Sequence, residues 1–526
     1  MRARLGLSAK GWTHPNLLKI FSFLLCCQCV LTVPAIGQSL REAMIAAYRN
    51  NPLLQSQRLQ TRAVDEHVPQ ALSGYRPKVS GEGFYGITSR DAKEPRVDQD
   101  AAETYGYSLK VEQPLFDGFR TRNSVREAES KVRGSRHDLR AKENDLLFET
   151  ASVYFDVLRA EGNLLYRRKA LTAMRRELVG AQERVRRGQS SITDLEQSRQ
   201  RAALARSEKK KAAAELRVSQ LRFVRITAIK PRSLRMVRLP TPHLPRSLRQ
   251  AINLAETNSP IIGSADSRTE AARHAANRAR GELLPSATIV GIYDRSFNSS
   301  TGYRDEEASS VVGRIRVPLF QGGQVYSRVR QAKSRAASLD RAASAAKLRV
   351  GEAVGAAWTE FKTARQRLSI ESESVKAGER ALAGVKEEHQ AGRRTLLDVL
   401  DAERELVDAR IRLLSTKRDL QVGAYALLRA TGSLTVGNLY PGAERYDPKA
   451  HYRAVRKRWW GVQVPTSENT VFLGREILNS PHATYSDTEK SHIGLSSQTA
   501  TAGQTLRSNS WQAKVSKRQK LPRQQE

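Results

Sequence analysis

Acidic side chains follow one another near residue 400 at a spacing that aligns them on one helix face. Asp398, Asp401, Glu405 and Asp408 are three or four residues apart, which is the interval between neighbours on an α-helix. Crowded carboxylates attract cations and resist simultaneous ionisation. An ordinary solvated face has the same pattern, and the helix dipole favours acidic residues in a first turn. The spacing alone leaves both interpretations open.

A second pattern, Gly81-x-Gly83-x-x-Gly86, matches the G-x-G-x-x-G signature of a dinucleotide-binding loop. Such a loop must end a strand and open a helix, so that phosphates meet free N–H groups. Here the glycines lie in alternating sequence that leads to a polar loop, and we interpret them as strand residues. No P-loop, H-E-x-x-H or G-x-S-x-G motif occurs. We therefore predict no catalytic residue, no cofactor and no metal site.

The chain is strongly basic, with 89 Lys and Arg against 54 Asp and Glu in 526 residues and a formal net charge of +35. Its basic clusters, such as residues 209–211, lie among glutamates and lack the interleaved aromatics of a nucleic-acid site, so we expect no nucleic-acid partner. Beyond the first segment, apolar runs of about 20 residues are missing. This excludes a polytopic helical membrane protein.

The first 37 residues have the features of a secretory signal peptide. Arg2, Arg4, Lys10 and Lys19 precede an apolar run at 20–33, and small residues at 35 and 37 fit a cleavage site. An uncleaved anchor is the alternative. All three cysteines (Cys26, Cys27 and Cys29) lie in this segment, so the processed chain would have no thiol. An exported chain of this kind is periplasmic, secreted or an outer-membrane barrel protein.

The sequence between residues 38 and 440 contains two similar repeats. Asn51-Pro52 and Ser259-Pro260 are 208 residues apart, whereas Gly188 and Gly392, like Asp194 and Asp398, are 204 apart. The segments QPLFDG at 113–118 and VPLFQG at 317–322 repeat in the same order. An ordered set of shared landmarks indicates internal duplication. We predict a first repeat at 38–230, a linker at 231–246 and a second repeat at 247–440.

Each repeat is predicted to contain the same elements. A helix of about 35 residues (near 40–74 and 248–283) precedes a β-hairpin (77–114 and 285–317), whose strands alternate apolar and polar residues. Proline-free helical sequence follows at about 121–186 and 325–390, and return helices lie near 193–229 and 395–431. Four strands cannot close a transmembrane barrel, whose smallest form has about eight, and open edges are not tolerated in lipid. Strands in a membrane would therefore have to be pooled by several chains.

From about Ser39 to Leu434 the chain resembles the TolC-type outer-membrane efflux proteins. The resemblance rests on Asn51-Pro52, on QPLFDG at 113–118 and on AGRRTLLDVLDA at 391–402. It implies a mixed α/β, mainly α membrane protein: a homotrimer whose 12-stranded β-barrel, with four strands per chain, lies in outer-membrane lipid. A long α-helical coiled-coil barrel would continue it across the periplasm. It also implies a periplasmic adaptor protein, an inner-membrane pump and passive export of drugs or, by type I secretion, of proteins.

The resemblance assigns roles to residues at the helix turns. Asp398 and Asp401 would form acidic rings at the periplasmic gate, and Asp194, at the matching place in the first repeat, would pair with Arg394 in the closed state. His389 stands where an aromatic residue is usual, which leaves that bonding open. The residues implied for adaptor docking are those of the turns and the first helical residues after them: Gly188, Gly392, Thr193, Thr395, Leu195 and Val399.

Residues 441–526 are polar and basic, and their composition predicts a disordered tail. Within it, residues 456–460 (RKRWW) could contact a partner or a membrane surface, or could simply be part of a mobile segment. A non-conducting periplasmic coiled-coil scaffold and a basic nucleic-acid-binding protein are the alternatives to an export duct. Ion conductance in planar bilayers would separate the scaffold from the duct.

Overall fold

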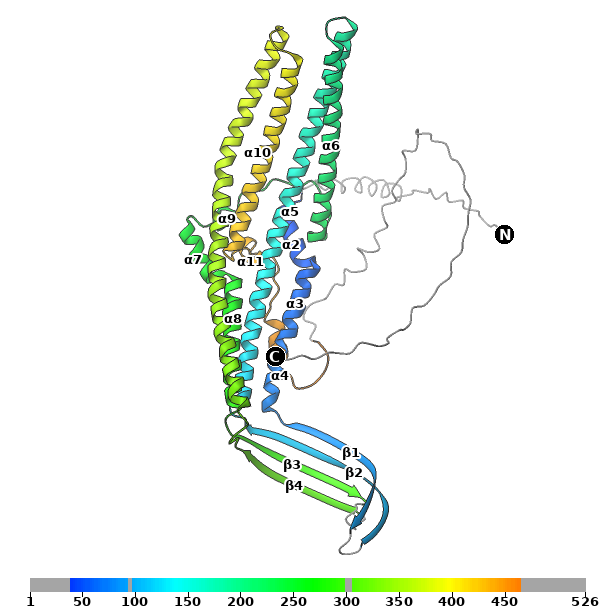
Figure 1. Ribbon diagram of the computed structural model, residues 1–526, viewed down its shortest axis with the longest axis vertical. Helices are drawn as coiled ribbons and strands as arrows, with labels where there is room; N and C mark the ends of the chain where they lie inside the picture. The colour runs from blue at the N-terminus through cyan, green and yellow to red at the C-terminus, as the bar shows by residue number, and fades with distance from the viewer. Residues whose placement is uncertain (1–37, 93–96, 299–304, 465–526) are drawn as a thin grey trace, which may run out of the picture. The chain divides into compact units, whose positions relative to one another are not determined.

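The structure, a computed structural model, describes residues 38–92, 97–298 and 305–464. These residues form a mainly helical protein with one four-stranded antiparallel sheet (Figure 1), which confirms the predicted mainly α, mixed α/β fold class. Short helices, a β-hairpin, a long helix and a return helix occur once on each side of the connection at 228–247. The predicted signal peptide at 1–37, residues 93–96 and 299–304 in the loops of the two β-hairpins, and residues 465–526 lie outside the described residues.

The opening helix of each repeat is broken, not continuous as predicted. The first repeat has α2 (Leu40–Asn50), α3 (Pro52–Asp65) and α4 (His67–Leu72), and the second has α7 (Leu248–Asn258) and α8 (Pro260–Gly281). A proline fits the first turn of a helix but not its interior, because it has no N–H to donate. Asn51 completes the break in the first repeat, since its side chain accepts hydrogen bonds from the N–H groups of Leu53 and Leu54.

The two predicted hairpins form and join into one sheet. Its strands are β1 (Lys78–Ala92), β2 (Val97–Phe116), β3 (Ser286–Phe297) and β4 (Asp305–Arg316), in the order β1-β2-β3-β4. The strands β2 and β3, one from each repeat, pair with Tyr105 opposite Phe297 and Glu112 opposite Val290. The strands β1 and β4 are therefore the edges of the sheet.

Two pairs of long helices extend from the sheet (Figure 1). The helices α5 (Arg120–Arg186) and α9 (Gln324–Gln390) each have 67 residues, which corresponds to roughly 100 Å. The return helices α6 (Ile192–Thr227) and α10 (Leu396–Ala430) run back beside them from turns remote from the sheet. The short helices cover the rest of each long helix, and α10 also packs on α5. In the described part of the chain, no helix is both long and apolar enough to cross a membrane.

The largest hydrophobic core lies where α2, α5, α6 and α10 meet. It contains the buried side chains of Met44, Tyr154 and Phe223. The predicted linker at 231–246 belongs to this core: Leu234 is buried in it, and the Tyr154 hydroxyl donates to the Arg235 carbonyl at 2.6 Å and accepts from its N–H at 3.0 Å. The connection between the repeats is thus fastened to the helices.

The tail predicted from residue 441 begins with folded sequence. After α11 (Val436–Leu439), residues 441–464 run along the short helices of the first repeat and include α12 (Ala450–Val455), in which His451 and Val455 are buried. Composition suggested disorder because few of these residues are apolar. They are held instead by aromatic rings and ion pairs to α3 and α5. The remainder, 465–526, lies outside the described residues.

Candidate functional site

The turns that join α5 to α6 and α9 to α10, which we call the tips, have the same construction. Gly188 and Gly392 follow the helix ends with φ of +69° and +74°, a left-handed backbone that glycine adopts without strain. The next N–H closes each turn: Gln189 donates to the Arg184 carbonyl and Arg393 to the Glu388 carbonyl, both at 2.8 Å. These bonds satisfy carbonyls that a helix end leaves free. Both tips are therefore defined, glycine-dependent turns.

Asp194 and Asp398 cap the helices that leave the tips. The Ser191 hydroxyl accepts from the Asp194 N–H at 3.1 Å, and the Thr395 hydroxyl accepts from the Asp398 N–H at 3.3 Å. Each carboxylate accepts from the N–H of its cap residue in return, which completes a capping box. Hydrogen bonds from Ser190 and Ser191 lower the pKa of Asp194, and those from Thr395 lower the pKa of Asp398. In this chain both aspartates have the helix-start role that the sequence left open.

Arg394 does not meet Asp194 in this chain. Its Nε donates to the Glu388 carboxylate at 2.8 Å, and this contact raises the pKa of the guanidinium. His389 Nδ1 lies 2.9 Å from the Arg394 carbonyl oxygen. The contacts of Arg394 therefore stay within the tip of the second repeat. The Asp194 carboxylate accepts hydrogen bonds from Ser190 and Ser191 in the tip of the first repeat.

Asp401 joins the two repeats near the tips. Its Oδ1 accepts from Arg201 Nη1 on α6 at 2.6 Å, and the side chains of Arg201 and Asp401 are 23% and 48% exposed. Beneath this ion pair, Leu400 of α10 packs with Met174 of α5 and Ala202 of α6 in a small buried cluster. Sequence reasoning missed Arg201 because its partner is 200 residues away, and no local motif marks it.

Further ion pairs continue along the contact between α5 and α10. Arg167 lies 3.2 Å from Asp408, Arg418 2.8 Å from Asp156, and Arg429 2.8 Å from Asp145. Positions 145, 156 and 167 recur every eleven residues, which returns to nearly the same side of a helix. Partly exposed pairs of this kind contribute about 0–1 kcal/mol each. Together with Arg201–Asp401 they form what we call the inter-repeat ladder.

A cleft of about 860 Å³ lies among the four long helices beside the ladder. Arg167, Arg201 and Asp408 line it together with apolar side chains that include Met174 and Leu400. The walls of the cleft come from the two helical hairpins, α5–α6 and α9–α10. A separation of these hairpins large enough to widen the cleft would therefore also break the Arg201–Asp401 pair.

The residues expected to dock an adaptor differ in accessibility. Thr193 and Thr395 are exposed and Leu195 is half-buried, while the Cβ that a substitution would add at Gly188 or Gly392 meets open space. Val399 of α10 is only 3% exposed. In this chain its side chain is therefore not accessible to an adaptor protein. Two apolar side chains that were not among the residues predicted to dock an adaptor, Ile192 and Leu397, are 71% and 38% exposed at the same tips.

The sheet has two chemically different faces, as cross-strand neighbours share a face. One, the apolar face, carries Leu109 with its cross-strand partner Tyr293, and Val111 with its partner Val79. The other, the polar face, carries Lys110 and Glu112 with their β1 partners Ser80 and Lys78. The exposed apolar side chains of the apolar face are Val79, Tyr85, Ile87, Tyr105, Tyr107, Leu109, Val111, Ile289, Val311 and Ile315. An exposed apolar face of this extent indicates that the sheet contacts a lipid or protein surface.

The glycine motif at 81–86 lies inside β1, where Gly81 pairs with Leu109 and Gly83 with Tyr107. A strand interior offers none of the free helix N–H groups that a dinucleotide loop requires. Among the described residues, no group of three or more His, Cys, Asp or Glu side chains has metal-binding geometry.

Comparison with known proteins matches both repeats. A family model described as outer membrane efflux protein matches residues 45–228 and 251–433. Outer membrane efflux protein BepC of Brucella suis biovar 1 is 31% identical over 432 residues, 82% of this chain and 93% of the relative. Outer membrane protein TolC of Vibrio cholerae is 26% identical over 407 residues, 76% of this chain and 92% of the relative. The Campylobacter jejuni CmeC outer membrane channel structure, 16% identical, aligns with a TM-score of 0.70 over 86% of this chain and 98% of its own.

Proposed function

The chain belongs to the outer membrane efflux protein family, and from that premise we propose that three copies assemble into one continuous export duct. The protein is an outer-membrane exit duct with a periplasmic helical extension. Its family consists of channel proteins, not of enzymes. In the proposed assembly the sheets close a 12-stranded barrel in the outer membrane. The long helices form the wall of a tunnel through the periplasm.

The two open edges of the sheet are the main support for a barrel shared by several chains. The strands β1 and β4 each have a partner on one side only, and the side chains of β4 are exposed along its whole length. Unpaired backbone groups are too costly to leave in lipid, so β1 of one chain has to pair with β4 of the next. Repeating this head-to-tail contact closes a ring. The apolar face then meets lipid, and the polar face lines the pore.

We assign the tips to the periplasmic end, where an adaptor protein and an inner-membrane pump would engage them. The exposed Thr193, Thr395, Ile192 and Leu397 support a docking surface there. The cargo is a drug in an efflux system or a protein in type I secretion, and the genes that neighbour this one would distinguish the two.

For the gate we propose the Arg201–Asp401 pair as the contact that holds the two hairpins of one chain together at rest. The pair spans the repeats, whereas the bonds of Asp194, Asp398 and Arg394 lie within single tips. Those three residues would shape the tips, and Asp398 would add negative charge at the entrance.

Fractionation and conductance test the function. The protein should be recovered with the outer membrane, run on unheated gels as an oligomer that heat dissociates, and form ion-conducting pores in planar bilayers. Recovery as a monomer without conductance would contradict the duct and would favour a periplasmic scaffold.

A further inference from the structure

The segment 441–464, which we call the strap, ends beside the base of the sheet, where β1 begins and β2 ends. Arg76, two residues before β1, donates from Nη1 to the Arg458 carbonyl oxygen at 3.0 Å. The same guanidinium lies over the Trp459 ring, 4.6 Å from its centroid. The side chain of Arg76 thus fixes the end of the strap at the point where helix gives way to strand.

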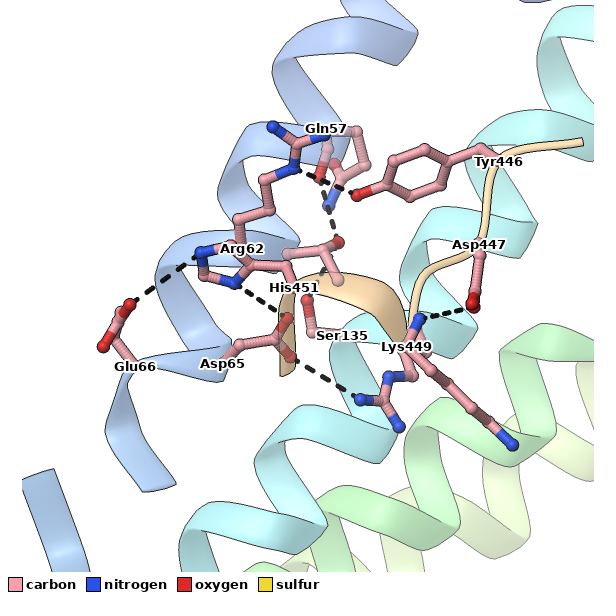
Figure 2. Close-up of polar contacts among 11 residues, drawn as sticks. Gln57, Arg62, Asp65, Glu66, Ser135, Tyr446, Asp447, Lys449 and His451 are labelled. Carbon is pink, nitrogen blue, oxygen red and sulfur yellow. Dashed lines mark hydrogen bonds and ion pairs between the residues drawn. The ribbon is translucent and has the colours of Figure 1, made fainter. Parts of the chain in front are cut away.

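Aromatic rings attach the start of the strap to α2 and α3. The Arg58 guanidinium lies 4.6 Å from the ring centroid of Tyr48 and 4.8 Å from that of Tyr446. The Tyr48 hydroxyl accepts from the Tyr446 N–H at 3.1 Å, and Arg62 donates from Nε to the Tyr446 hydroxyl at 3.3 Å. Figure 2 shows the Arg62–Tyr446 contact beside α3.

A largely buried cluster of ionisable side chains attaches the middle of the strap. His451 Nδ1 lies 3.3 Å from Asp65 Oδ2, and its Nε2 lies 3.8 Å from Glu66 Oε1 (Figure 2). Arg136 Nη2 lies 3.7 Å from the other Asp65 oxygen, and its guanidinium lies over the Tyr452 ring. The side chains of His451 and Asp65 are 4% and 1% exposed, so the strap is part of the folded core at this point.

The end of the strap is apolar and uncovered. Trp459 is 58% exposed, Trp460 85%, Val462 100% and Val464 66%. Arg458 braces this end from within, because its Nε donates to the Trp460 carbonyl at 3.1 Å and its Nη1 to the Gln463 carbonyl at 2.5 Å. The Trp459 ring lies between the Arg76 guanidinium and the Trp460 ring, whose centroid is 6.3 Å away, and more than half of each tryptophan is exposed.

The surroundings of these tryptophans have the composition of a membrane interface. Other exposed apolar side chains at the base of the sheet or in the turns that follow it are Leu115, Phe119, Leu319 and Phe320. Lys78 and Lys457, each within two residues of the Arg76–Arg458 contact, are exposed. Tryptophan prefers the level of lipid headgroups, and lysine near it attracts anionic headgroups.

We propose that Trp459–Val464 is a membrane anchor, in which the strap inserts its two tryptophans into the headgroup region of the periplasmic leaflet of the outer membrane. The partner is a phospholipid surface, zwitterionic with an anionic fraction. This anchor rests on the proposed function, since it requires the sheet to span the membrane and its base to lie at that leaflet. It would fix the depth of the barrel and tie the helices of the first repeat to the bilayer.

Tryptophan fluorescence in brominated lipid tests the anchor. With Trp358→Phe and Trp511→Phe, Trp459 and Trp460 are the only tryptophans beyond residue 37. The protein is reconstituted in phosphatidylcholine–phosphatidylglycerol vesicles with bromine either near the headgroup end or near the methyl end of the acyl chains. We expect blue-shifted emission and a greater loss of intensity with bromine near the headgroup.

A matched variant carries Trp459→Phe and Trp460→Phe together with Leu53→Trp in the same background. Leu53 is 72% exposed at the start of α3, with the lengths of α3 and α4 between it and the sheet, and its tryptophan should keep its intensity in both lipids. Unquenched Trp459 and Trp460 in vesicles that conduct ions would overturn the anchor and leave the duct intact. Vesicles without insertion or conductance would overturn the duct, and the anchor with it.

Discussion

Arg201 on α6 and Asp401 on α10 form an ion pair with 2.6 Å between Nη1 and Oδ1, and this pair joins the tips of two hairpins from different repeats. The pair lies over the apolar contact of Leu400 with Met174, so separating the hairpins must break both. We therefore expect this junction to oppose opening of the duct.

The substitution Arg201→Ala should raise the resting conductance. A partly exposed pair contributes about 0.5 kcal/mol, so three copies that open together would shift the open-to-closed ratio roughly tenfold. Single-channel recording in planar bilayers measures this ratio. The charge exchange Arg201→Asp with Asp401→Arg is the control and should restore closure. A resting conductance of Arg201→Ala equal to that of the unaltered protein would show that the pair does not hold the gate closed.

Removing a cap should loosen one tip without affecting the other. Thr395→Ala deletes the acceptor for the Asp398 N–H and should destabilise the start of α10 by about 1 kcal/mol, and Ser191→Ala should do the same for α6. Hydrogen exchange of the tip amides measures the change. Equal exchange at both tips in each single variant would contradict independent caps.

The tips should also loosen in acid. The pKa values of Asp194 and Asp398 are lowered in the folded chain, so their carboxylates stabilise the tips above the ordinary aspartate pKa of about 3.9. That stabilisation is lost as the pH falls through the lowered values. Exchange rates corrected for intrinsic pH dependence should rise at both tips, and Asp398→Asn should abolish the pH response at the α10 tip alone.

Gly118 and Gly322 occupy matching places after the second strand of each hairpin, but only Gly118 is crowded. Both have positive φ, +68° and +59°, which costs an alanine roughly 1–2 kcal/mol. A Cβ at Gly118 would also collide with the Gly281 carbonyl oxygen, whereas one at Gly322 meets open space. Gly118→Ala should lower the thermal unfolding midpoint more than Gly322→Ala at the same scan rate. The reverse order would contradict the close approach.

His451→Ala should release the strap. Burial raises the pKa of Asp65, and Arg136 and His451 are what oppose this effect. Losing one buried partner costs about 1–3 kcal/mol, which increases opening of the segment roughly 5- to 150-fold. Trypsin cleavage within 441–464 reports the opening. His243→Ala, at an exposed position, is the control, and equal cleavage in the two variants would show that His451 does not hold the strap.

Much of the fold could be predicted because it follows from local patterns. Alternation predicted the strands that pair Tyr105 with Phe297, and Gly188 and Gly392 predicted where the long helices turn. Pro52 and Pro260 mark the breaks in the opening helices. Helical periodicity on both sides of each proline nevertheless led to the prediction of one continuous helix. A residue pattern reports helix content more readily than a one-residue interruption.

The inter-repeat contacts could not be predicted from the sequence. The partners of Asp401 and of His451 lie 200 and 386 residues away, and their pairing depends on how whole helices pack. The strap was predicted to be disordered for the same reason, since Tyr446 and His451 look like isolated residues until α3 supplies their partners. Local composition does not predict contacts between residues that are so far apart in the sequence.

The central claim is that β1 of one chain pairs with β4 of the next until three chains close a ring. Beyond residue 37 the chain has no cysteine, so Ser80→Cys on the polar face of β1 can be combined in turn with Ser310→Cys, Val312→Cys or Arg314→Cys on the same face of β4. The measurement is the mass of the oxidised, denatured protein from outer membranes. We predict that one combination yields a covalent ladder that stops at three chains, and only uncross-linked monomer, or a ladder that passes three, would contradict the account.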